Sequence, residues 1–265
     1  YMVERSLFPI YGNLVEIIQN EFEYYAIPGY FNDKLNLGQG YKRPIERLRT
    51  ENAFFFDTIP ANRHFIMPFV ADDVTSYNLL RDTVKLPMFR AIKINMEGSG
   101  YGHNLVYHNI YSQPTDSLLK PMMHRSDNFF AEQILLMVSN ERLGIMNDEK
   151  ILDTILKTDF NDLPQKPRWV DGSGLSRYNL FTPQDLVSIL NKMKNEFGME
   201  RVKGIFPTGG QGTLANYYIP DSSYIYAKTG TLSGVVALSG YLYTKKGKEL
   251  LFSVLVNNHQ ASGTE

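Results

Sequence analysis

Two short motifs of this 265-residue chain hold side chains that could do acyl-transfer chemistry. The first is Ser126-Asp127-Asn128, just before an amphipathic helical pattern, and the second is Lys228-Thr229-Gly230-Thr231, beside a strand-like run that it is expected to end. Each motif alone also has a plain structural interpretation, because Ser, Asp and Asn are favoured helix caps and a lysine before glycine suits an exposed turn. Their order and their separation of 102 residues, 228 minus 126, favour a joint functional role.

The second motif combines groups that a serine acylation site needs. A serine nucleophile is activated by a base, and lysine can serve as that base when burial and a second cation disfavour its charged form. Lys228 can supply part of that field. Gly230 has no Cβ, so a substrate backbone can approach the strand there, and a backbone N–H beyond it can bind an oxyanion. Thr229 and Thr231 offer hydroxyl groups to a terminal carboxylate.

Other catalytic chemistries lack their motifs in this sequence. The five histidines show no HExxH pair or other familiar zinc spacing, so we predict no metal site and no cofactor. Ser99 and Ser173 have glycine directly on both sides, which is not the G-x-S-x-G pattern of a hydrolase elbow. The phosphate-binding glycine motifs are missing, and the absence of cysteine excludes thiolate catalysis and disulfides.

Composition excludes further classes of protein. With 43% apolar and 21% charged residues, the chain has the composition of an ordinary globular protein. Its 27 basic and 28 acidic residues are balanced in both halves, so it lacks the basic surplus that nucleic-acid binding requires. The longest apolar runs, such as Leu250 to Val256, are far shorter than the roughly 18 residues of a transmembrane helix.

The elements that must position the two motifs are helices and an antiparallel sheet. Thr182, Pro183 and Asp185 form a helix start with a capping box, a second helix with an apolar face is expected after Asn128, and a third near Asp148 to Leu156. Three strands are predicted further along, at Ser223 to Thr229, Val235 to Thr244 and Leu250 to Asn257. The C-terminal part is therefore predicted to be α+β, with helices packed on a mainly antiparallel sheet.

The first 110 residues have a different pattern. Short aromatic-rich runs, Ala53 to Phe56 and His64 to Val70, are broken by prolines and polar clusters, which predicts a mostly β module. A helical pattern at Val74 to Leu86 interrupts it, and the Gly98 to Gly102 cluster suits a turn near its end. We place a boundary between residues 105 and 115, which divides the chain into 1–110 and 111–265.

Together these motifs resemble a known family. The chain is similar to the C-terminal portion of a penicillin-binding D-alanyl-D-alanine carboxypeptidase/endopeptidase, the low-molecular-mass type with inserted domains between its first and second motifs. From about Ser112 to Asn258 further segments resemble the family in the same order, namely Trp169-Val170-Asp171-Gly172-Ser173-Gly174-Leu175-Ser176-Arg177, Gly212-Thr213-Leu214, Ala227 to Leu232 and Phe252-Ser253-Val254-Leu255-Val256-Asn257-Asn258. Upstream the resemblance is thin, around Thr58-Ile59-Pro60-Ala61.

The resemblance implies a fold and a division of the chain. It implies a β-lactamase/transpeptidase-like α+β domain, incomplete here, in which residues 111–265 are the C-terminal part of the catalytic domain. Residues 1–110 would then be the remnant of an inserted, mostly β domain. Peptidoglycan stem peptides and β-lactam antibiotics are the expected partners. The expected location is the periplasm or another extracytoplasmic compartment, with a signal peptide outside this chain.

The resemblance also assigns roles to the motif residues. It implies that Ser126 passes protons between the active-site lysine and the leaving amine, that Asn128 holds a substrate amide, and that Lys228 supports the electrostatics of acylation. Thr229 and Thr231, flanking Gly230, would receive the terminal D-alanine carboxylate, and the N–H of Thr231 would form half of the oxyanion hole.

Arg177 has two open interpretations. The resemblance makes it a contact for an acidic side group of the peptide. A glycine-rich turn whose arginine is merely solvated fits the sequence as well.

The family's first motif, a serine with lysine three residues later, is expected far upstream of Ser126. The single S-x-x-K of this chain is Ser117-Leu118-Leu119-Lys120, which ends six residues before Ser126. Ser117 and Lys120 would share a helical face, but the resemblance gives this position to the helix that leads into the Ser126 motif. We therefore expect the nucleophile in sequence that precedes Tyr1, and we expect this chain alone to be inactive.

The resulting functional hypothesis is a serine-type D-Ala-D-Ala carboxypeptidase/endopeptidase that acts on stem peptides through an acyl-enzyme and is inhibited by β-lactams. Two alternatives stay open from the sequence. One is a non-catalytic peptidoglycan-binding homologue that has lost the nucleophile. The other is a β-lactam or ester hydrolase on the same scaffold.

Overall fold

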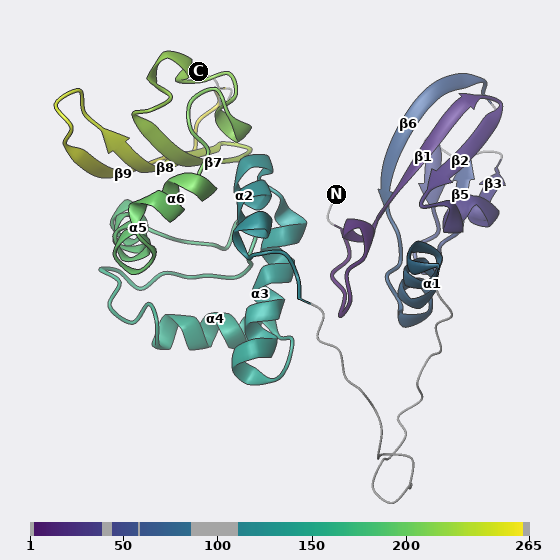
Figure 1. Ribbon diagram of the computed structural model, residues 1–265, viewed down its shortest axis with the longest axis horizontal. Coiled ribbons are helices and arrows are strands. Elements are labelled where there is room, and N and C mark those ends of the chain that lie inside the picture. The colour runs from purple at the N-terminus through teal and green to yellow at the C-terminus, as the bar shows by residue number, and fades with distance from the viewer. Residues whose placement is uncertain (1–2, 39–43, 58, 86–110, 262–265) are drawn as a thin grey trace, which may run out of the picture. The chain divides into compact units, whose positions relative to one another are not determined.

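The computed structural model describes residues 3–38, 44–57, 59–85 and 111–261 (Figure 1). The chain divides into two compact units, Tyr1–Tyr111 and Ser112–Glu265, and we describe each by itself. The predicted turn at Gly98 to Gly102 lies outside the described residues. That the first unit is the remnant of an inserted domain stays a prediction.

The N-terminal unit is mostly β, with one α-helix among its described residues. Its antiparallel sheet has the strand order β2-β1-β6, with β1 (Leu14–Glu21), β2 (Glu23–Ile27) and β6 (Ala61–Pro68). Three short strands form a second sheet in the order β3-β5-β4, with β3 (Leu35–Leu37), β4 (Ile45–Arg47) and β5 (Phe54–Phe56). The helix α1 (Asp73–Val84) matches the predicted helical pattern, and short 3-10 helices occupy Tyr11–Asn13 (η1) and Gly29–Lys34 (η2).

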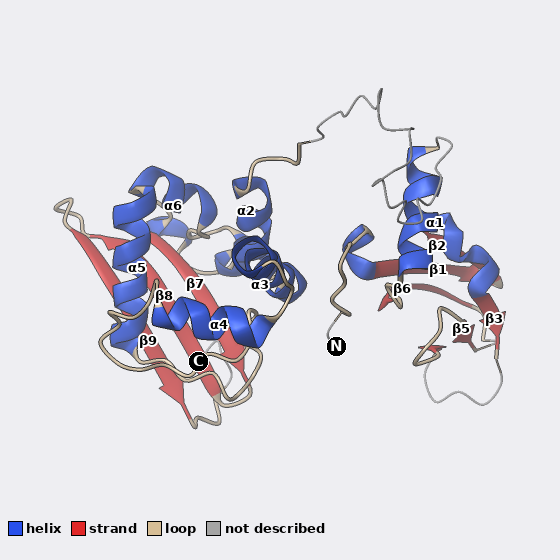
Figure 2. Cartoon of the chain, turned by 90° about the horizontal axis from the view of Figure 1, so that it is seen from below, coloured by secondary structure: helices blue, strands red, loops and turns tan. Residues whose placement is uncertain are grey.

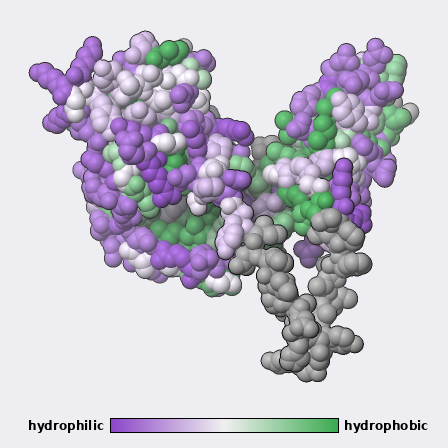
Figure 3. All heavy atoms as spheres, in the orientation of Figure 1, coloured by the Kyte–Doolittle hydropathy of each residue, from purple (hydrophilic) through white to green (hydrophobic). Residues whose placement is uncertain are grey.

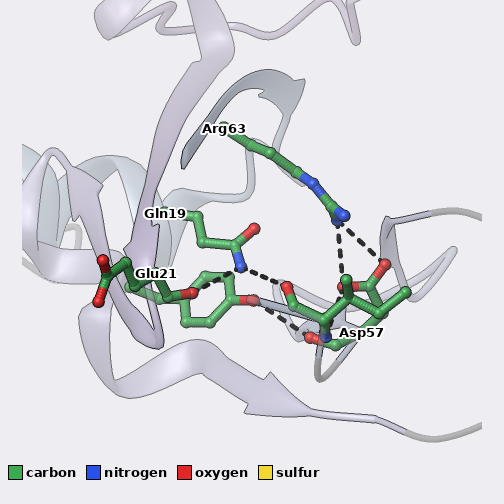
Figure 4. A network of polar contacts seen from close by, with 6 residues as sticks. Gln19, Glu21, Asp57 and Arg63 are labelled. Atoms are coloured by element: carbon green, nitrogen blue, oxygen red, sulfur yellow. Dashed lines mark hydrogen bonds and ion pairs between the residues drawn. The ribbon is translucent and has the colours of Figure 1, made fainter. Parts of the chain in front are cut away.

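Aromatic side chains fill the core of this unit. Phe31, Phe54 and Phe69 are fully buried and pack on one another as well as on apolar residues of β1 and α1. A polar network closes the end of the sheet (Figure 4). There Gln19 donates hydrogen bonds to the backbone carbonyls of Glu21 and Ile59, while Asp57 accepts two hydrogen bonds from Arg63. These contacts hold the chain before β6 against β1.

The C-terminal unit is α+β, which confirms the predicted fold class. Its antiparallel sheet has the order β7-β8-β9, with β7 (Ile225–Leu232), β8 (Val235–Tyr243) and β9 (Glu249–Asn257). The helices are α2 (Asp116–Arg125), α3 (Asn128–Leu143), α4 (Asp148–Lys157), α5 (Pro183–Phe197) and α6 (Met199–Ile205), with 3-10 turns at Gly212–Leu214 (η3) and Ile219–Asp221 (η4). Helix α5 packs on β8 and β9, and α6 packs on α5 and α2 (Figure 2).

Local sequence chemistry explains the most regular elements. Thr182 and Asp185 form the predicted reciprocal capping box of α5. The core between helices and sheet centres on Tyr241, which is fully buried and donates a 2.7 Å hydrogen bond to the Leu190 carbonyl of α5. The predicted β8–β9 hairpin is confirmed, and Figure 3 shows hydrophilic side chains at its tip, where the turn holds Lys245 and Lys246.

One strand boundary was predicted wrongly. The sequence placed the strand at Ser223 to Thr229, with the Lys228 motif at its end, whereas β7 continues through the whole motif to Leu232. The reason is the pairing of β7 with β8. Every residue of β7 from Ile225 to Leu232 has a partner on β8, and Gly230 lies opposite Ala237.

Candidate active site

The Ser126 motif occupies a sharp junction between two helices. Helix α2 ends at Arg125, and Ser126 follows in the left-handed conformation with φ 53° and ψ 51°. Asp127 then caps α3, because its side chain accepts a 3.0 Å hydrogen bond from the N–H of Phe130. Only Asp127 is the N-cap of α3, while Ser126 is left exposed at the bend and Asn128 is the first residue of α3.

Lys228 reaches this junction from the sheet. Its Nζ lies 2.8 Å from the Ser126 hydroxyl and 2.7 Å from the Thr229 carbonyl oxygen. The two motifs, 102 residues apart in sequence, are therefore in direct contact. Burial lowers the pKa of Lys228 to about 8, because desolvation disfavours the ammonium form. A lysine in this state exchanges protons near neutral pH, which an ordinary surface lysine does not.

The outer edge of β7 presents backbone groups. Ala227 donates its N–H to the Pro207 carbonyl at 2.9 Å, on the side of β7 away from β8. Since N–H groups alternate between the two edges of a strand, those of Thr229 and Thr231 point to this same side. Among the described residues no strand pairs with this edge beyond Ala227, so it is an unpaired sheet edge of the kind to which an extended peptide can add.

The side chains of the second motif are split between the two faces of the sheet. Alternation along β7 puts Lys228 and Gly230 on one face, and Thr229 and Thr231 on the other. The structure therefore brings Lys228 to Ser126, whereas the side chains of Thr229 and Thr231 lie on the opposite face of the sheet. Thr229 is half-buried and Thr231 is exposed beside the open edge.

Gly230 is not required by the fold of the chain. Its φ is not positive, and an added Cβ would meet the Ala237 Cβ at 3.5 Å, an ordinary contact. Gly240 on β8 differs, because a Cβ there would overlap the Tyr226 carbonyl oxygen and lie 2.6 Å from the Ala227 Cα. Packing explains the glycine at 240, whereas nothing within the described chain explains the one at 230.

A loop over residues 168–180 lies beside the helix that carries the first motif. Arg168 and Leu180 pair at its base through two backbone hydrogen bonds. Inside the loop Asp171 accepts hydrogen bonds from the N–H groups of Gly174 and Ser176 at 2.7 and 2.6 Å. These contacts give the glycine-rich segment a defined shape.

Glu132 of α3 anchors this loop, and sequence reasoning missed it. The Glu132 side chain is 3% exposed and accepts hydrogen bonds from the N–H and the hydroxyl of Ser173 at 3.0 and 2.6 Å. Gly172 lies so close to α3 that a Cβ there would be 2.8 Å from the Ala131 carbonyl. The available signal was an acidic residue at the fourth position after Asn128, between the apolar runs 129–131 and 134–138.

Arg177 lies at the other end of the same loop. Its guanidinium donates a 2.8 Å hydrogen bond to the Ser233 carbonyl, in the turn that follows β7. The residue is otherwise exposed. The loop thus contacts both α3 and the end of the strand that holds Lys228, and both interpretations of Arg177 stay open.

Ser117 and Lys120 lie on helix α2, as predicted, and both are exposed. In the part of the chain that the structure describes, no hydrogen bond joins their side chains. The described residues also contain no group of three metal-binding side chains. None of the described helices combines the length and the apolar character needed to span a membrane.

Comparisons with known proteins agree on one family. The model of the D-Ala-D-Ala carboxypeptidase 3 (S13) family matches residues 93–265. The chain is 29% identical over 167 residues to the D-alanyl-D-alanine carboxypeptidase DacB of Haemophilus influenzae, covering 58% of this chain and 34% of that protein. It is 33% identical over 163 residues to a D-alanyl-D-alanine carboxypeptidase of an Actinomadura species, covering 56% and 29%. The chain spans about a third of the length of these curated relatives.

A solved structure supports the fold. The crystal structure of penicillin binding protein 4 (dacB) from Haemophilus influenzae superposes with a TM-score of 0.65 and 22% identity, over 99% of this chain and 67% of that one. At this level of identity the likeness establishes the architecture.

Proposed function

The chain belongs to the D-Ala-D-Ala carboxypeptidase 3 (S13) family, and from this premise we propose that it supplies two walls of the active site of a serine peptidase. The substrate would be the D-Ala-D-Ala end of a peptidoglycan stem peptide, and the reaction would pass through an acyl-enzyme. The single observation that carries the proposal is the 2.8 Å contact between Lys228 Nζ and the Ser126 hydroxyl.

In this proposal Ser126 and Lys228 handle protons and charge. The acylated serine belongs to the family's first motif, together with its own lysine. Ser126 relays a proton from that lysine to the leaving amine of D-alanine, and Lys228 holds Ser126 in place. With a pKa of about 8, Lys228 can gain or lose a proton near neutral pH when negative charge develops on the substrate in the acylation step. Asn128, at the start of α3, would bind a substrate amide.

The open edge of β7 would bind the peptide backbone. A peptide added there as an extra strand meets the outward N–H of Thr231, which would contribute to the oxyanion hole. Gly230 has no side chain, so the backbone of the peptide can approach β7 closely at this position. Thr229 and Thr231 would reach the terminal carboxylate around the outer edge of the strand.

Arg177 would bind an acidic side group of the peptide and so contribute to substrate specificity. Its guanidinium lies beside the turn that follows β7, which supports a contact with an acidic side chain, since a guanidinium pairs well with a carboxylate. β-Lactams would bind to the same residues as substrate mimics. Because peptidoglycan lies outside the cytoplasmic membrane, an extracytoplasmic location follows from the proposed substrate.

Intact mass spectrometry with penicillin tests the proposal. A longer form of the protein that includes a serine with lysine three residues on should form a covalent adduct and release D-alanine from a D-Ala-D-Ala peptide. Absence of an adduct at a saturating concentration of penicillin would refute the proposed serine peptidase activity. Peptide binding with neither adduct nor release would support the non-catalytic alternative.

A further inference from the structure

We propose that Ser126 is itself an acyl acceptor, with Lys228 as its general base, and that this pair in the 265-residue chain reacts with small activated esters. This goes beyond the proposed peptidase function, in which Ser126 only relays protons. It does not depend on a second serine, and it is tested on the chain as it stands.

The geometry fits that of a serine–lysine pair. A nucleophile and its base must lie within about 2.6–3.2 Å, with the base oriented by a third group. The Ser126 hydroxyl lies 2.8 Å from Lys228 Nζ, and the Thr229 carbonyl, 2.7 Å from the same nitrogen, orients it. Ser126 is exposed at the bend between α2 and α3, so a small reagent can reach its hydroxyl.

The electrostatics also favour the neutral lysine. Burial lowers the pKa of Lys228 to about 8, so a substantial fraction of Nζ is unprotonated near that pH. The residue opposite Lys228 on β8 is Ser239, which carries no negative charge that would stabilise the ammonium form. In the structure Nζ donates to the Ser126 oxygen at 2.8 Å. A neutral Nζ has a free lone pair, so the direction reverses in that state and the Ser126 hydroxyl donates to the nitrogen.

The two other serines that lie in motifs discussed above, Ser117 and Ser173, have no hydrogen bond to a lysine among the described residues. Ser117 shares an exposed helical face with Lys120, but no hydrogen bond joins them in the described residues. The Ser173 hydroxyl donates to Glu132, which is buried. Ser126 therefore differs from both by its direct contact with a partly desolvated amine.

The reaction with p-nitrophenyl acetate would proceed as follows. Lys228 Nζ takes the hydroxyl proton of Ser126, and Oγ forms a bond with the acetyl carbonyl carbon. The ester C–O bond breaks, and p-nitrophenolate leaves with the electron pair. Lys228 then gives its proton to water, which leaves an acetyl ester on Ser126.

Peptide mapping of the acetylated chain tests this assignment. We expect one acetyl group on Ser126, which hydroxylamine removes because it is an ester. Ser126→Ala should abolish the label, and Ser117→Ala, the matched control on α2, should leave it unchanged. Acetyl on Lys228 Nζ, resistant to hydroxylamine, would overturn the proposal, as would equal labelling of Ser126→Ala.

The pH profile and one further variant test the role of the base. Labelling should increase with pH and level off above about 8, where Lys228 has lost its proton. Lys228→Arg keeps a cation that cannot act as a base, so it should lower the rate by about 100-fold or more. A rate unaffected by this change would overturn the proposal. The penicillin experiment has a separate outcome, because it needs a serine outside this pair.

Discussion

The hydroxyl of Ser173 donates a 2.6 Å hydrogen bond to the side chain of Glu132, one turn into the helix that Asn128 begins. The N–H of Ser173 donates to the same oxygen at 3.0 Å. Through this contact the 168–180 loop, which also carries Arg177, is fixed to the helix of the first motif. The distance between Arg177 and the Ser126 junction is thus set partly by the buried side chain of Glu132.

Ser173→Ala should destabilise the C-terminal unit. The change removes one of the hydrogen bonds that satisfy a buried oxygen, which costs about 1–3 kcal/mol. Trp169, the single tryptophan of the chain, lies in the same loop, so its fluorescence during urea unfolding reports this unit. Ser112→Ala is the matched control, because Ser112 is exposed and its hydroxyl donates to the neighbouring Gln113 carbonyl. Equal midpoints for the two variants would contradict the anchoring role.

Gly230→Ala and Gly240→Ala should separate binding from folding. The methyl group added at position 230 would find only an ordinary contact with Ala237, so stability should change by less than about 0.5 kcal/mol, while affinity for a D-Ala-D-Ala peptide falls. The methyl group added at position 240 would overlap the backbone of Tyr226, and this should cost about 1–3 kcal/mol or more. Urea unfolding and calorimetric titration with the peptide measure the two effects. Unchanged peptide binding in Gly230→Ala would argue against a substrate at β7.

Local chemistry explains which elements the sequence could predict. The start of α5 depends on Thr182, Pro183 and Asp185, which interact within one turn, so the prediction needed no tertiary information. The end of β7 depends on its pairing with β8, which no local pattern contains, and glycine and threonine at 229–231 imitate a turn. The same limit applies to the site. Ser126 and Lys228 could be associated through the order of their motifs and the family resemblance, but their direct contact could not be predicted. Glu132 stands out among apolar residues, yet nothing local indicates that its partner is Ser173, 41 residues away.

Stability should depend on pH through Lys228. Burial lowers its pKa from 10.5 to about 8, so between these two values the unfolded chain holds a proton that the folded chain has released. The unfolded state binds more protons there, and the contribution of Lys228 therefore becomes more favourable to folding as pH rises from about 8 towards about 10. Urea unfolding of wild type and Lys228→Met should show the difference shifting towards wild type over this range. Lys120→Met, at an exposed position of α2, is the matched control for loss of a lysine. A parallel pH dependence in all three proteins would mean that the pKa of Lys228 is not lowered.

Arg177→Ala should change which peptides the site prefers. If the guanidinium pairs with an acidic side group, its loss should weaken binding of a stem peptide with a free side-chain carboxylate about tenfold, because hydrogen bonds to charged groups contribute about 1.5–3 kcal/mol. A peptide with that carboxylate amidated should bind the variant and the wild type equally. Arg168→Lys, at the base of the same loop, serves as the control, since its backbone pairing with Leu180 is kept. Calorimetric titration of both peptides decides the matter. An equal loss for the two peptides would mean that Arg177 acts only by holding the Ser233 carbonyl and the loop in place.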